Sequence, residues 1–105
     1  MTARKYAFKM ADCLEKSSQT PYEKALSLTL LLKRLALMKF KNENAAVLYG
    51  ADWLDFLKKH SKTPLFQGAV GDIIKTIQYA PPEKLKQTDV RNLFADARVW
   101  INQNI

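Results

Sequence analysis

The segment from residue 20 to about residue 40 constrains the fold most, because it has the pattern of a helix that is apolar on two sides. It begins with Thr20-Pro21-Tyr22-Glu23, in which Thr20 can cap free backbone N–H groups, proline suits the first helical position and Glu23 completes a capping box. Its apolar residues then form two stripes at helical spacing, Leu28, Leu31, Leu32, Leu35 and Met38 in one and Leu26, Leu30 and Leu37 in the other. A helix that is apolar on two sides is normally packed between neighbours. We therefore expect this segment to be the central helix of an all-helical fold.

Helical periodicity continues through the rest of the sequence. We expect helices over residues 3–16, over 45–60 with an interruption at Gly50, and over about 68–80, where Ala80-Pro81-Pro82 ends the pattern. A last helix begins at a cap formed by Thr88-Asp89. No segment alternates with a period of two, so no strand is predicted. The 105 residues are enough for one domain with a real core but not for two. The predicted fold is all-α: a compact single-domain bundle of about five helices spanning residues 1–105.

Apolar residues at helical spacing indicate which faces point inward. In the first helix the predicted inward stripe consists of Ala3, Tyr6, Met10, Cys13 and Leu14. Cys13 is therefore expected to be a small buried residue, and a reactive thiol is the weaker alternative. Trp53, Phe56 and Trp100 are predicted to build the core.

The net charge of +7 is concentrated at the beginning of the chain. Residues 1–41 hold nine lysines and arginines against three acidic residues, whereas residues 42–105 are nearly balanced. Such a field favours anionic partners, which include nucleic acid, anionic lipid headgroups and acidic protein surfaces. The composition alone does not choose among them.

Two aspartates and the single histidine are the only constellation that suggests catalysis. Asp52 and Asp55 would share one face of a helix, and His60 follows at its end. Each also has a structural explanation: Asp52 suits the first helical turn, Asp55 can pair with Lys59, and His60 suits the helix C-terminus. A hydrolase built on these residues is therefore a minor hypothesis, and we predict no catalytic residue and no enzyme.

Metal and cofactor sites are not indicated either. One cysteine and one histidine cannot make a tetrahedral zinc site of the usual kinds. The three glycines do not form a phosphate-binding loop. We therefore predict no metal and no cofactor.

Nucleic-acid binding remains the alternative function. The last helix offers polar residues of the kinds that contact bases, namely Arg91, Asn92, Arg98, Asn102 and Gln103. However, Asp89 and Asp96 share its surface. The basic excess lies instead on the first two helices, of which the second is expected to be buried. A basic helical nucleic-acid-binding domain is kept as an alternative that the sequence does not favour.

The order of motifs from Ala25 onward resembles that of a known bacterial family. The matching stretches are ALSLTLLLKRLAL, AAVLYGADWLDFLKKH, the Tyr79-Ala80-Pro81 segment and LFADARVWI. The most specific piece is Gly50-x-x-Trp53-Leu54-x-Phe56-Leu57, followed by Ala97-Arg98-x-Trp100-Ile101. The chain is similar to the soluble part of a domain-of-unknown-function family of small inner-membrane proteins. These are encoded beside MoxR-type AAA+ ATPases and von Willebrand factor A (Bat-type) proteins.

That resemblance implies a membrane context. The family has one membrane-spanning helix before a basic, tyrosine-containing segment, whereas this chain opens at Arg4-Lys5-Tyr6 without one. We therefore expect the chain, soluble as given, to be the cytoplasmic domain of a longer protein anchored in the bacterial inner membrane. The positive charge of residues 1–41 would then lie beside an anionic leaflet. The family has no established activity, so the resemblance supplies no catalytic residues.

The sequence and the resemblance together predict a non-catalytic protein-interaction or assembly module. Its expected partners are a MoxR-type ATPase and von Willebrand A proteins, with an anionic membrane surface as a further contact. The residues expected to make these contacts are Arg4, Lys5, Lys9, Lys16 and Arg98.

Overall fold

Thr20 and Glu23 start the second helix as the sequence predicts. In the computed structural model, which describes residues 2–79 and 84–105, Thr20 Oγ1 accepts from the Glu23 N–H at 3.1 Å and Glu23 Oε1 accepts from the Thr20 N–H at 3.0 Å. These hydrogen bonds lower the pKa of Glu23, the bond from the Thr20 backbone most of all. The capping box therefore forms and fixes the beginning of α2 (Pro21–Lys39).

The described residues form five α-helices and two short 3₁₀-helices, with no strand among them, which confirms the predicted all-α bundle. Besides α2 the elements are α1 (Ala3–Lys16), η1 (Lys41–Glu43), η2 (Ala45–Val47), α3 (Gly50–Lys59), α4 (Gly68–Thr76) and α5 (Gln87–Asn104). None of the helices in these two ranges has the length and hydropathy needed to cross a lipid bilayer.

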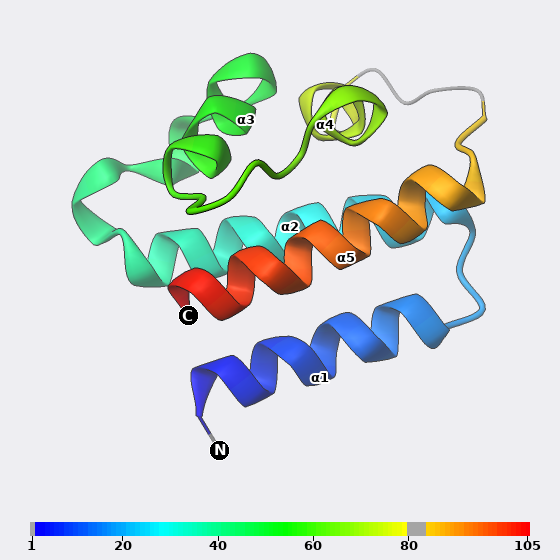
Figure 1. The fold of residues 1–105 in the computed structure, drawn as a ribbon, viewed down its shortest axis with the longest axis horizontal. Helices are drawn as coiled ribbons and strands as arrows, with labels where there is room; N and C mark the ends of the chain where they lie inside the picture. The colour runs from blue at the N-terminus through cyan, green and yellow to red at the C-terminus, as the bar shows by residue number, and fades with distance from the viewer. Residues whose placement is uncertain (1, 80–83) are drawn as a thin grey trace.

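The long helices α2 and α5 lie side by side in the middle of the molecule (Figure 1). They run in the same direction, and α1 runs opposite to them and contacts both. The shorter helices α3 and α4 pack against each other on the other side of this pair, where α4 contacts α5. The core thus lies between the α2–α5 pair and the α3–α4 pair.

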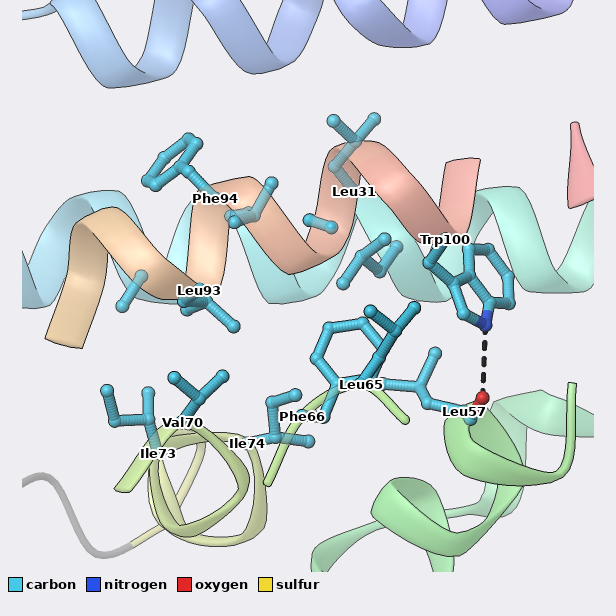
Figure 2. Packing of buried hydrophobic residues seen from close by; sticks show 14 of the residues in the cluster. Leu31, Leu57, Leu65, Phe66, Val70, Ile73, Ile74, Leu93, Phe94 and Trp100 are labelled. Carbon is cyan, nitrogen blue, oxygen red and sulfur yellow. Dashed lines mark hydrogen bonds between the residues drawn. The ribbon is translucent and has the colours of Figure 1, made fainter. Parts of the chain in front are cut away.

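Aromatic residues fill this core as the sequence predicts. Trp53, Phe56 and Trp100 are all buried. Trp100 Nε1 donates to the Leu57 carbonyl oxygen at 3.1 Å, which joins α5 to α3 (Figure 2). Apolar side chains of α4 and α5 continue the core beside this bond. A fully buried tryptophan whose N–H is satisfied contributes both apolar area and a fixed orientation.

The predicted inward stripe of α1 is wrong. The helix buries Ala7 and Ala11, while Tyr6 is 42% exposed and Cys13 lies on the surface. Met10 and Leu14 are only partly buried at the edge of the core. The reason is steric, because two alanines on one face let α1 approach α2 and α5 closely, which larger side chains would prevent.

Of the second predicted apolar stripe of α2, only Leu26 packs against the core, and it is partly buried. Leu28, Leu31, Leu32 and Leu35 face the core, but Leu30 and Leu37 are 46% and 39% exposed. Met38, expected to be inward, is exposed as well. α2 is therefore covered on one side and leaves apolar side chains on its outer surface.

Several helix boundaries differ from the prediction. Residues 45–47 form a 3₁₀-helix, and α3 starts separately at Gly50, whose φ of +59° favours glycine. α4 ends at Thr76, and the predicted stop at Ala80-Pro81-Pro82 lies outside the described residues. α5 begins two residues early, at Gln87, and neither Thr88 nor Asp89 provides the cap, which is Lys86 without a side-chain hydrogen bond.

Candidate functional site

The four basic candidates on α1 lie on its exposed surface. Arg4, Lys5, Lys9 and Lys16 are all exposed, and none of them forms an ion pair with another described residue. Three of them, Lys5, Lys9 and Lys16, line a broad groove of about 570 Å³ together with Phe8. α1 thus carries free positive charge on the side that faces away from the bundle.

Arg98, the fifth predicted contact residue, lies in a different environment. Its Nη2 donates to Asp12 Oδ1 at 2.8 Å and to Glu15 Oε1 at 2.6 Å, and its guanidinium lies 5.8 Å from the Phe94 ring centroid. Burial lowers the pKa of Arg98, but the hydrogen bonds that it donates to Asp12 and Glu15, together with their negative charges, outweigh burial and raise the pKa overall. Arg98 therefore joins α5 to α1 within the molecule, with two carboxylates as partners.

The candidate catalytic residues do not come together. Asp52 and Asp55 are exposed on α3, and within the described ranges neither bonds to His60. The His60 ring lies instead 3.0 Å from a Glu43 oxygen and stacks on Phe40 with the ring centroids 3.8 Å apart. His60 is the C-cap residue of α3, as predicted. The three residues of the hydrolase hypothesis therefore share no site.

Glu43 is a residue whose role the sequence did not reveal. Its Oε1 accepts from Lys59 Nζ at 2.9 Å, so the predicted Asp55–Lys59 pair is wrong. The hydrogen bond from Lys59, followed by that from His60, lowers the pKa of Glu43. The cluster ties η1 to the end of α3. Lys59 and His60 lie 16 and 17 residues after Glu43, a separation that helical spacing rules do not cover.

A second groove lies around Lys33 on α2. It is lined by Lys33, Ala46, Val47, Leu48, Tyr49, Gln78 and Tyr79, and its volume is about 370 Å³. Lys33 Nζ donates to the Leu48 carbonyl oxygen and lies 4.8 Å from the Trp53 ring centroid. We call these seven residues the Lys33 groove. The sequence gives no signal for this groove, because Lys33 simply follows the apolar residues Leu30, Leu31 and Leu32.

The polar groups behind this groove are incompletely satisfied. Burial lowers the pKa of Lys33, and no carboxylate of the described residues forms an ion pair with it. The indole Nε1 of Trp53 is buried and has no hydrogen-bond partner among the residues that the structure describes. Polar groups of this kind usually find partners in folded proteins, so their clustering marks this region as unusual.

No group of three or more His, Cys, Asp or Glu side chains in residues 2–79 and 84–105 is arranged to hold a metal ion. The surface features are therefore a basic helix face, an internally paired arginine and a groove that combines apolar, aromatic and cationic side chains. They belong to a small helical domain.

The chain belongs to the family described as Domain of unknown function (DUF4381), whose model matches residues 2–103. This agrees with the resemblance to a domain-of-unknown-function family that its motifs carry. No curated protein and no solved structure matches the chain.

Proposed function

We propose that this chain is a non-catalytic protein-interaction or assembly domain. The supporting observation is the set of apolar and aromatic side chains exposed beside Lys33. Val47, Tyr49 and Tyr79 are 62%, 70% and 62% exposed and line one groove. Leu30 and Leu37 lie three residues before and four residues after Lys33, so they share its face of α2. Exposed apolar side chains that gather in one region are typical of protein-binding surfaces.

The proposal includes a cellular context taken from the family resemblance. The domain works at the cytoplasmic face of the bacterial inner membrane, as part of a membrane-tethered protein. Its partners there are a MoxR-type ATPase and von Willebrand A proteins. The positive charge of α1, which has no ion-pair partner in residues 2–79 and 84–105, supports this placement, because lysines and arginines near an anionic leaflet are attracted to it.

Co-purification tests the interaction. The full-length protein, tagged at its C-terminus and extracted from native membranes with mild detergent, should bring down the ATPase or a von Willebrand A protein. Leu37→Glu should weaken this recovery because it places a charge on the exposed apolar face, whereas the equally exposed position Val99 on α5 offers Val99→Glu as the control. If neither the ATPase nor a von Willebrand A protein is recovered from the native membranes, the proposal is contradicted.

One observation keeps nucleic-acid binding as a second candidate: Arg4, Lys5, Lys9 and Lys16 are exposed without ion-pair partners in the described structure. Binding of this kind is governed by phosphate contacts and weakens steeply with salt. A mobility shift with duplex or single-stranded DNA or RNA at low salt, reduced by Lys5→Gln and Lys9→Gln together, would support it. No shift at low salt would dispose of it.

A further inference from the structure

The position of Lys33 is the first step of the inference. Its ammonium group lies partly buried between the Leu48 carbonyl and the face of the Trp53 ring, 4.8 Å from the ring centroid. An ammonium group has three donors, and only one of them has a hydrogen-bond acceptor among the described residues. Lys33 therefore presents unused donors and a positive charge at the wall of the groove.

That charge is not neutralised within the described structure. The ion pairs there join Lys59 and His60 to Glu43, Lys75 to Asp72, and Arg98 to Asp12 and Glu15, but none of them includes Lys33. Removing a cation from water without a counter-charge is unfavourable, and the lowered pKa of Lys33 reflects that cost. A carboxylate in the groove would supply both the missing charge and the missing acceptors.

The other walls of the groove favour an apolar neighbour of that carboxylate. Val47, Tyr49 and Tyr79 are each more than half exposed, so they offer large side chains that are not buried by the domain itself. The Tyr79 hydroxyl lies over Gly50, where an added Cβ would come within 3.2 Å of it. Tyrosine is enriched among the residues that contribute most to protein interfaces because it is large and also forms hydrogen bonds.

The openness of these walls favours a peptide over a small molecule. Ligand pockets for small molecules bury most of the ligand surface, whereas the side chains here stand largely in solvent. The surface also continues along α2 through Leu30 and Leu37, as an extended partner would require.

We propose that the Lys33 groove binds an acidic, apolar peptide segment of a partner protein. A carboxylate of the segment pairs with Lys33, and an adjacent apolar side chain packs against Val47, Tyr49 and Tyr79. This proposal rests on the proposed function as an interaction domain, and it names the surface and the chemistry of the partner.

Selection from a phage-displayed library of random peptides on the immobilised full chain tests the proposal. Selected peptides should contain Asp or Glu next to an apolar residue. Synthetic copies should bind wild type about tenfold more tightly than they bind Lys33→Gln, the loss expected for one charge-assisted bond. Lys33→Arg, which keeps the charge, should retain binding, and Tyr49→Ala should weaken it from an exposed position that does not support the fold. Lys9→Gln on α1 is the matched control that should bind as wild type does.

Four outcomes overturn the proposal. The selection could enrich no sequence or only sequences without acidic residues, or the selected peptides could bind Lys33→Gln as tightly as wild type. Binding of sodium acetate at Lys33 without binding of any selected peptide would indicate a small-anion site instead.

The two proposals can fail separately. If the partner proteins co-purify equally with wild type and Lys33→Gln, the groove assignment is wrong and the interaction function stands. If acidic peptides bind at Lys33 but no partner protein is recovered from membranes, the assignment of the partner system fails and the groove stands.

Discussion

The polar groups of α5 and those of the Lys33 groove differ in how fully their bonding capacity is used within the described residues. On α5, Arg98 has two carboxylate partners and Trp100 Nε1 donates to a carbonyl oxygen. At the groove, Lys33 has no carboxylate partner and Trp53 Nε1 has no acceptor among the described residues. Each region contains a cation and a buried indole, so composition does not distinguish them. The difference teaches that the polar groups of α5 are satisfied within the domain, whereas those of the groove keep bonding capacity that no described residue uses.

The largest expected effect compares the two tryptophans. Trp100→Phe should lower the free energy of unfolding by about 2–3 kcal/mol. It leaves a cavity, and it also deprives the Leu57 carbonyl oxygen of its hydrogen-bond donor. Trp53→Phe should lower it by about 1–2 kcal/mol, because it leaves a cavity but breaks no hydrogen bond among the described residues. Urea denaturation followed by circular dichroism measures both. Equal losses would contradict the comparison.

The next effect concerns the glycine beneath Tyr79. Gly50→Ala should lower the free energy of unfolding by about 2 kcal/mol, since φ is +59° and the new Cβ would meet the Tyr79 hydroxyl. Gly68→Ala is the matched control, with φ at +57° and no atom of the described residues within 4 Å of the new Cβ, and should lower it by about 1 kcal/mol. Thermal denaturation of the two variants measures the difference that the Tyr79 contact makes. If both lose the same stability, Tyr79 does not rest on Gly50.

Replacing each cation by methionine tests the comparison directly. Arg98→Met should lower the free energy of unfolding by about 1 kcal/mol, because Asp12 and Glu15 lose their shared partner. Lys33→Met should leave it unchanged or raise it by up to about 1 kcal/mol, because it removes a partly buried charge that no described carboxylate balances, at the cost of one hydrogen bond to the Leu48 carbonyl oxygen. Chemical denaturation at neutral pH measures both. A loss at Lys33 as large as that at Arg98 would show that Lys33 is already satisfied.

The smallest effect is a dependence on pH. Because the folded-state pKa of Lys33 lies below its ordinary value of 10.5, the folded chain releases this proton before the unfolded chain does. Stability contributed by Lys33 therefore rises as the pH increases through the lowered pKa toward 10.5. Any advantage of Lys33→Met over wild type should shrink over that range, while the Arg98→Met deficit should not, since Arg98 stays charged. Denaturation of the three proteins over a pH series checks this, and a constant difference at Lys33 would contradict it.

The sequence predicted the features that depend on local spacing. The capping box at Thr20, the five helices, the buried Trp53 and Trp100 and the position of His60 at a helix end all follow from residues a few positions apart. It did not predict which stripe of α1 or α2 would be covered, since periodicity gives a face but not the element that packs on it.

The candidate site was less predictable for the same reason. Glu43 reaches His60 across 17 residues, and Lys33 reaches the Leu48 carbonyl across 15. Such contacts depend on how η1 and η2 direct the chain from α2 to α3, and short 3₁₀-helices have no strong sequence signal. The exposed cations of α1 were identified, but the Lys33 groove emerges only from the tertiary structure.

The alanine face of α1 has a consequence for local opening. Ala7 and Ala11, the buried residues of α1, remove little apolar area from water, and its larger side chains are only partly buried, so α1 is attached less strongly than helices that bury leucine or tryptophan. The ion pairs of Arg98 with Asp12 and Glu15 then hold the C-terminal part of α1 to α5. We expect amide hydrogens of α1 to exchange with solvent faster than those of α2, and faster still once Arg98 is replaced. Equal protection of the two helices would mean that the first helix opens only when the whole bundle does.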